Sequence, residues 1–280
     1  RDGRLAARKA KKQVTDRKGL LGAGSSLPSK LADCTIHDRD QTEIFIVEGD
    51  SAGGGMKQTR NNETQAIMPL RGKIQNAEKA GEKTLDSDAI KDLLSAIGGV
   101  ITDIKVPILK NGKPTGRSKT KLIVDISEPR YGIVVIAVDA DVDGGHIATL
   151  LLTFFYRFAP QLIKEGRVYL AQLPLYKVEH KKEGRKYLYN DEELQALMKK
   201  DVLKRRADGE VDVTRFKGLG EMMPEQLRET ALDPETRRLQ RVSIEDEADA
   251  ENITTLLMGS RVDRRREYIE ENAASVEADV

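Results

Sequence analysis

Residues 133–144 read IVVIAVDADVDG, in which a largely β-branched apolar run passes directly into alternating carboxylates. A run without polar alternation is typical of a strand buried on both faces, as in parallel sheets. Asp139 and Asp141 follow this strand at once, and Asp143 follows as the chain turns. Since α/β folds bind ligands at the carboxyl edge of the sheet, we expect these side chains to lie at a binding site there.

A second apolar run, IFIV at residues 44–47, ends in Glu48 and a glycine-rich turn at residues 49–55. Like-charged carboxylates that share a site raise one another's pKa values unless a hard divalent cation lies between them. The two motifs therefore indicate a magnesium site, with manganese or calcium as substitutes, which Glu48 would complete.

Two other interpretations of these motifs are weak. Residues 139–144 match the opening of a calcium-binding EF-hand loop, but Leu150 occupies the twelfth position, where a bidentate glutamate is needed, and a strand precedes the loop. The turn at residues 49–55 resembles a nucleotide-phosphate turn, but it lacks the full Rossmann spacing and the lysine of a P-loop.

The amino-acid composition excludes several classes of binding partner and of metal site. The 280 residues are 39% hydrophobic, 33% charged and 4% aromatic, with a net charge of +1, which excludes a uniformly basic surface. Basic runs at residues 1–18, 105–121 and 261–266 still favour DNA on one face. The single cysteine excludes an internal disulfide and a multi-cysteine zinc site. Because no apolar stretch approaches the roughly 18 residues of a membrane span, we expect a cytoplasmic protein with no membrane partner.

The hydrophobic pattern predicts an α/β fold: a Rossmann-like central parallel sheet flanked by helices, followed by a smaller mixed α+β region. We expect a basic linker or extension at residues 1–40, a metal-binding domain at 41–178 with a basic insertion at about 101–121, and a C-terminal tail at 179–280. The predicted strands are residues 44–47, 67–70, 133–138, 168–173 and 175–178. The predicted helices are residues 1–18, 56–60, 86–97 and 147–158, and residues 216–222 form a loop.

Both acidic motifs together resemble the Toprim metal site of topoisomerases, primases and some nucleases. Further motifs occur in the order seen in the B subunits of bacterial type IIA topoisomerases, the family of DNA gyrase and topoisomerase IV: GDSAGG at 49–54, PLRGK at 69–73, LLLTFFYR at 150–157, PLY at 174–176 and RFKGLGEM at 215–222. The chain is similar to the C-terminal half of these subunits over residues 28–272. Gly55, Met56 and Ala148 leave the branch of the family open.

This resemblance implies a DNA cleavage and religation module. Its catalytic and magnesium-binding residues would be Glu48, Asp139 and Asp141, with Asp143 close by. DNA contacts would come from Lys73 and Asn76, and Asp50 and Arg71 would border the quinolone-responsive region.

The resemblance also implies a partner. An A subunit would supply the nucleophilic tyrosine in an A2B2 heterotetramer, and none of the seven tyrosines here lies in a recognisable activated motif. The ATPase region of the family is not expected in this chain, which would be a fragment of an ATP-hydrolysing type IIA topoisomerase. Two alternatives stay open: a Toprim nuclease or nucleotidyl transferase, and a noncatalytic DNA-organising module. The sequence does not separate Glu48 as metal ligand from Glu48 as proton shuttle.

Overall fold

The computed structural model describes residues 27–110, 113–181, 184–197 and 211–273. The predicted helix at residues 1–18 lies outside the described residues. In this part of the chain, no helix is long and apolar enough to cross a membrane.

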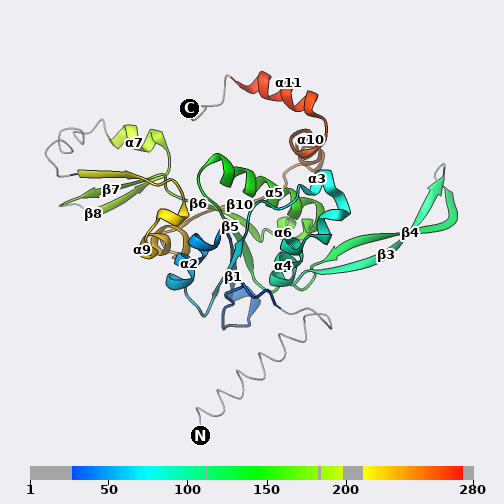
Figure 1. The fold of residues 1–280 in the computed structure, drawn as a ribbon, viewed down its shortest axis with the longest axis horizontal. Helices are drawn as coiled ribbons and strands as arrows, with labels where there is room; N and C mark the ends of the chain where they lie inside the picture. Colours follow the sequence, from blue (N-terminus) through cyan, green and yellow to red (C-terminus); the bar gives the residue numbers. More distant parts are fainter. Residues whose placement is uncertain (1–26, 111–112, 182–183, 198–210, 274–280) are drawn as a thin grey trace, which may run out of the picture.

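A five-stranded central sheet organises the molecule (Figure 1). Its strand order is β10-β6-β5-β1-β2, formed by β1 (Glu43–Glu48), β2 (Gln65–Leu70), β5 (Ile133–Ala137), β6 (Val168–Gln172) and β10 (Arg238–Arg241). The strands β6, β5, β1 and β2 run parallel, whereas β10 is antiparallel to β6. In the register, Phe45 of β1 lies between Ile67 of β2 and Val135 of β5.

Helices cover both faces of this sheet, which explains the unbroken apolar strands. Ile44 and Ile46 point into one hydrophobic cluster, together with the apolar residues of α4 (Asp88–Ile97), α5 (Val142–Phe158) and α6 (Pro160–Lys164). Phe45 and Val47 point into the other, with α2 (Asp50–Thr59), α9 (Pro224–Leu227) and η5 (Arg228–Leu232). Because strand side chains alternate between faces, the inner strands β1, β2 and β5 are buried on both sides, and the predicted α/β class is confirmed.

Two helices begin earlier than their apolar spacing predicts. Helix α5 starts at Val142 instead of residue 147, because the Asp141 side chain caps it by accepting the Gly144 N–H at 2.7 Å. Helix α2 starts at Asp50 instead of residue 56, within a glycine-rich segment of low helix propensity that tertiary packing holds helical.

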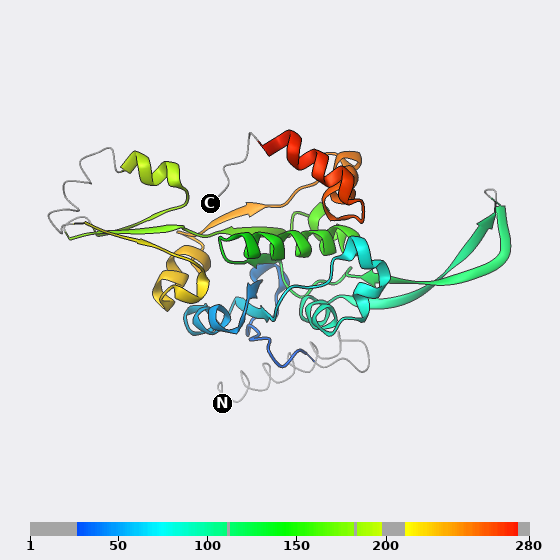
Figure 2. The same ribbon diagram turned by 45° about the horizontal axis from the view of Figure 1, so that its top comes forward.

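The predicted basic insertion is a long hairpin of β3 (Val100–Lys110) and β4 (Lys113–Asp125). It extends from the body on the side opposite β7 and β8 (Figures 1 and 2). Its base is fixed by Ile101, Leu122 and Val124, which pack against the core, and by the Leu122 N–H, which donates to Glu82 at 3.2 Å.

A second, antiparallel sheet has the order β8-β7-β9, formed by β7 (Tyr176–His180), β8 (Gly184–Leu188) and β9 (Val211–Arg215). Strands β8, β9 and β10 were not predicted. The remaining elements are η1 (Arg39–Gln41), α3 (Ala77–Ala80), η2 (Gly81–Asp86), α7 (Asp191–Leu197), η4 (Leu219–Glu221), α10 (Glu247–Met258) and α11 (Val262–Asn272).

The C-terminal region contributes directly to the central sheet. Strand β10 pairs with β6, and Arg237 beside it donates two hydrogen bonds, of 2.6 and 2.8 Å, to the Glu43 carboxylate of β1. Gln65 of β2 donates to the same carboxylate at 2.7 Å. Residues beyond 178 thus complete the sheet of the first region, and the division into domains stays a prediction.

Candidate metal centre

The carboxyl ends of β1 and β5 lie side by side at the point where the strand order reverses. The chain passes from β1 outward to β2 and then returns to place β5 on the other side of β1. Open α/β sheets form their ligand sites at such a switch point. Glu48 is the last residue of β1 and Asp139 follows the end of β5, so the topology brings these two carboxylates to one site.

Glu48 is partly buried at this edge. Its Oε2 accepts a long hydrogen bond of 3.4 Å from the Asp139 N–H. Burial raises the pKa of the Glu48 carboxyl above its ordinary value of 4.5; the Asp139 N–H opposes this, and the charges of Asp139, Asp141 and Asp143 raise the pKa further. The charges of the other three predicted metal carboxylates therefore all act on Glu48.

Asp139 is held by a segment from the C-terminal region. The Leu219 N–H donates to its Oδ1 at 2.7 Å. A Cβ atom at Gly218 would overlap this carboxylate and lie only 2.7 Å from its Cγ, so the backbone of the 216–222 segment approaches as closely as a glycine allows. Burial raises the pKa of Asp139, the Leu219 N–H lowers it, and the charges of Asp141 and Glu221 raise it.

The sequence did not reveal this contact. Residues 216–222 were expected to form a loop, with no role at the carboxylates. The structure instead uses the backbone of Gly218 and Leu219 to fix Asp139. The available signal was the pair of glycines at positions 218 and 220, which is typical of a close backbone approach.

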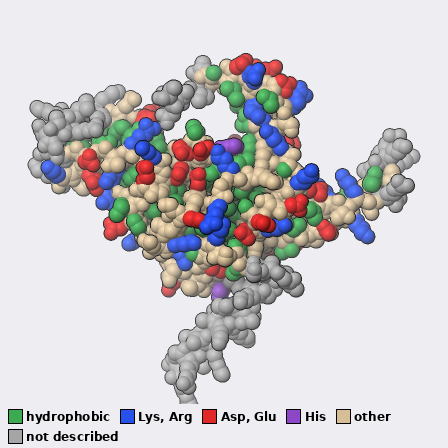
Figure 3. Space-filling model, viewed as in Figure 1, with side chains coloured by type: hydrophobic (Ala, Val, Ile, Leu, Met, Phe, Trp, Pro, Cys, Tyr) green, Lys and Arg blue, Asp and Glu red, His purple; other side chains and the backbone are tan. Residues whose placement is uncertain are grey.

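Asp141 and Asp143 lie at the first turn of α5. Oδ1 of Asp141 accepts the capping hydrogen bond from the Gly144 N–H. Asp143 is exposed and forms an ion pair of 2.5 Å with Lys73. The hydrogen bond and charge of Lys73 lower the pKa of Asp143, and His146 adds a smaller effect in the same direction. Figure 3 shows acidic side chains gathered on the central body with basic ones beside them.

These residues suit a hard cation. Within the described ranges, no three His, Cys, Asp or Glu side chains are close enough to enclose a metal on their own. Magnesium does not require such a cage, because it keeps several waters and binds through one or two carboxylates together with substrate phosphates. Glu48 and Asp139, whose pKa values are raised partly by neighbouring carboxylates, are the donors that a cation would relieve of repulsion.

Asp50 and Arg71 also meet near this edge. Arg71 follows β2, and its Nε donates to Asp50, the first residue of α2, at 2.7 Å. Both side chains are at least half exposed. The resemblance placed both residues at the border of the quinolone-responsive region. In the structure their ion pair joins the start of α2, which follows β1, to the segment that follows the adjacent strand β2.

Asn76 has a structural role in the described part of the chain. Its side chain caps α3 by accepting the Glu78 N–H at 3.0 Å, and its Nδ2 donates to the Met258 carbonyl at 2.8 Å. It thereby ties α3 to the end of α10. The predicted contact between Asn76 and DNA stays a prediction.

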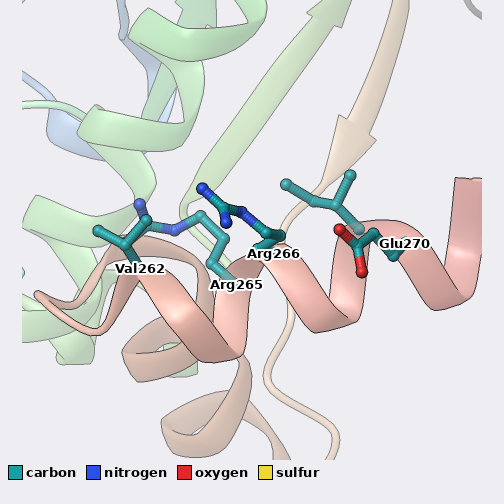
Figure 4. Close-up of a pocket in the computed structure, with 5 residues that line it drawn as sticks. Val262, Arg265, Arg266 and Glu270 are labelled. Carbon is teal, nitrogen blue, oxygen red and sulfur yellow. The ribbon is translucent and has the colours of Figure 1, made fainter.

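A separate hollow lies along α11 and contains no comparable group of carboxylates. Val262, Arg265, Arg266, Ile269 and Glu270 line it, all from this one helix (Figure 4). It offers apolar and basic side chains with a single acid. This surface therefore lacks the group of carboxylates that makes the switch point the candidate metal centre.

Comparison with known protein families gives two matches. Residues 43–173 match the Toprim domain, and residues 208–270 match the carboxyl terminus of the DNA gyrase B subunit. The first match spans β1 to β6 and therefore both Glu48 and Asp139. The second includes the segment that holds Asp139.

Individual relatives agree with these matches. The DNA gyrase B subunit of Clostridium acetobutylicum is 50% identical over 274 residues, which cover 98% of this chain and 39% of the relative. The corresponding proteins of Thermus thermophilus and Thermotoga maritima are 47% and 44% identical, each over 99% of this chain and 40% and 39% of the relative. The chain thus spans about two fifths of the length of these relatives.

Proposed function

Since this chain carries the Toprim domain and the carboxyl-terminal region of the DNA gyrase B family, we propose that it is the magnesium-binding DNA cleavage and religation module of a type IIA topoisomerase. The observation that supports this most is the meeting of Glu48 and Asp139 at the switch point of the sheet, with both pKa values raised. Such perturbed carboxylates at a ligand edge are typical of functional sites.

In this proposal, Glu48, Asp139 and Asp141 hold magnesium, with Asp143 close by. When bound, the ion offsets negative charge on the phosphoryl oxygens and on the leaving 3′ oxygen. Asp139 is held in place by Leu219 and so provides a fixed oxygen. Glu48 has a raised pKa, and the hydrogen bond that it accepts from Asp139 is long, which suits it to exchange a proton with the 3′ oxygen as well as to bind metal.

Lys73 is the proposed DNA contact nearest to these carboxylates. Its ammonium group pairs with Asp143, and its side chain is 41% exposed. A phosphate that approached the metal would compete for this ammonium group, and magnesium at Asp143 would replace its charge. We propose that Lys73 then contacts the DNA backbone.

The nucleophile is proposed to come from a gyrase-type A subunit, in an A2B2 complex. Tyr131 donates its hydroxyl to Asp33 at 2.6 Å, and Tyr187 donates to Glu229 at 2.7 Å. Burial raises the pKa of both phenols, that of Tyr187 to about 12, so they stay protonated and are poor nucleophiles at neutral pH. Neither lies among the predicted metal residues.

The test is reconstitution with a gyrase A subunit, supercoiled DNA and magnesium, followed by denaturation and detection of protein-linked DNA breaks. We expect breaks with the wild-type chain and none with Glu48→Ala or Asp139→Ala, because these changes remove oxygen ligands at a strand end without removing core volume. Lys91→Ala, on the exposed side of α4, is the control and should cleave normally. Cleavage at the wild-type rate by either acidic variant would contradict the assignment.

A further inference from the structure

We propose that the β3–β4 hairpin is a DNA-binding arm that lies in a groove of duplex DNA outside the metal centre. The proposal rests on the proposed function for the identity of the nucleic acid, and on the shape and charge of the hairpin for the contact itself.

The hairpin has the dimensions of a groove-binding ribbon. Its strands contain 11 and 13 residues, and at about 3.3 Å per residue the shorter strand measures roughly 36 Å. Among its described side chains, those that pack against the core lie at its base: Ile101, Leu122 and Val124. The rest extends away from the body (Figure 2). The major groove of B-DNA, about 12 Å wide, admits a two-stranded ribbon of this kind.

Beyond its base, the arm carries charges of one sign. Residues 105–121 contain six lysines and arginines and no acid, although the whole chain has 47 basic and 46 acidic residues. Within the described ranges, Lys105, Lys119 and Lys121 are exposed and take part in no ion pair. Blue side chains are visible along the described part of this arm in Figure 3.

The register places these cations on both faces of the ribbon. Lys121 lies opposite Ile104 and Lys119 opposite Val106, so these pairs share one face. Lys105 lies opposite Thr120 and therefore points to the other face. Whichever face of the ribbon turns toward the DNA, it therefore presents at least one cation.

Lysines on an exposed strand also have a simpler role, because they prevent edge-to-edge aggregation. A surface that serves solubility alone normally mixes both signs of charge. The absence of acids over residues 105–121, in a chain of nearly balanced charge, favours a polyanionic partner over simple protection of the edge.

The test measures how duplex binding depends on salt. A fluorescein-labelled duplex is titrated with the full chain at several salt concentrations, without an A subunit. The test variant replaces Lys105, Lys119 and Lys121 with Gln. The control replaces Lys91, Lys181 and Lys186 with Gln; these are exposed lysines of α4 and of the β7–β8 hairpin, and their loss changes net charge equally.

We expect the slope of log K against log[salt] to become shallower by about two to three in the test variant, because each lost phosphate contact contributes about 0.9. In the control variant, the slope should change by less than the value of about 0.9 that one phosphate contact contributes. Equal slopes in the two triple variants would overturn the proposal. The same titration is repeated with single-stranded DNA and with polyglutamate, a polyanion that represents an acidic protein. If the test variant lost affinity for one of these but not for the duplex, the proposal would also be overturned.

A second variant guards against misfolding. Asp103 and Leu122 are register partners, so an Asn-Gly turn that replaces residues 104–121 closes the hairpin at its base. This shortened variant should have the same Tm as the wild-type chain and the same shallow salt dependence of duplex binding as the triple Gln variant. The Glu48→Gln variant should keep the wild-type slope while losing cleavage with the A subunit, so failure of the proposed function and failure of the arm give different results.

Discussion

The backbone N–H of Leu219 donates a hydrogen bond of 2.7 Å to Oδ1 of Asp139, which lies 80 residues earlier in the chain. The donor belongs to the region that matches the gyrase B carboxyl terminus, and the acceptor belongs to the Toprim domain. A proposed metal ligand is thus oriented by a segment outside the stretch that matches the Toprim domain. The geometry of the candidate site depends on both matched regions.

Gly218→Ala should disturb this arrangement, because a Cβ would overlap the Asp139 carboxylate. We expect reconstituted cleavage to need several-fold more magnesium and the magnesium-induced rise in Tm to shrink. Gly220→Ala is the control in the same segment, since its Cβ would lie 3.4 Å from Ser51 Oγ, which can rotate. An unchanged magnesium requirement in Gly218→Ala would show that Asp139 does not depend on this contact.

Glu48→Gln should stabilise the metal-free protein at neutral pH. The pKa of Glu48 is raised by folding, so its charge opposes folding above that raised pKa and has no effect below its ordinary value of 4.5. We expect a higher Tm than wild type at about pH 7, and no difference at about pH 4. Added magnesium should reverse the order. Melting curves measured with EDTA and with magnesium test this, and a lower Tm of the variant in EDTA at pH 7 would refute it.

Lys73→Ala should weaken duplex binding and reduce its salt slope by about one phosphate contact. The side chain is exposed and pairs with Asp143, so its removal leaves the core intact. Lys73→Arg should retain the slope, because the charge remains. Anisotropy titrations over a salt series check this, and an unaltered slope in Lys73→Ala would assign the residue to the Asp143 ion pair alone.

Arg237→Ala should destabilise the whole fold by about 3 to 5 kcal/mol, because the Glu43 carboxylate then lacks its cation in a largely buried place. Denaturant unfolding measures this. A double variant, Glu43→Gln with Arg237→Met, should recover most of the loss. A cost below 1 kcal/mol for the single change would mean that the C-terminal region is energetically separate from the central sheet.

The chain without an A subunit should neither relax nor nick supercoiled DNA, and it should not hydrolyse ATP. It contains carboxylates for a metal but no P-loop signature, and the tyrosines Tyr131 and Tyr187 stay protonated. Agarose-gel assays and phosphate release test this. Nicking by purified chain that disappears in Glu48→Ala would favour the nuclease alternative, because a contaminating enzyme would not respond to that substitution.

Much of the central sheet was predictable because its strands are apolar on both faces. The runs before Glu48 and Asp139 gave β1 and β5 nearly residue for residue. Strand β10 was not predictable, because RLQR has neither an apolar run nor apolar alternation. It is defined by pairing with β6 and by the Arg237–Glu43 contact, which depend on tertiary structure alone.

The position of the candidate site was likewise predictable, but its supports were not. Acidic residues that follow apolar strand runs can be recognised in the sequence. A backbone N–H such as that of Leu219 carries no side-chain signal. Asn76 is a different case. The resemblance implied that it contacts DNA, and the structure adds that it caps α3 and donates a hydrogen bond to the Met258 carbonyl. Its sequence neighbours gave no sign of these two contacts.

The place of β10 sets an order of events during synthesis of the protein. It pairs with the outer edge of β6, yet it is made last among the strands, about 65 residues after β6, which corresponds to roughly 3 to 13 s of translation. Until then, the nascent sheet presents an open edge, the kind of surface on which chains join one another. Ribosomal pausing between these two strands should therefore promote aggregation, and a chaperone that shields the β6 edge would be needed most in that interval.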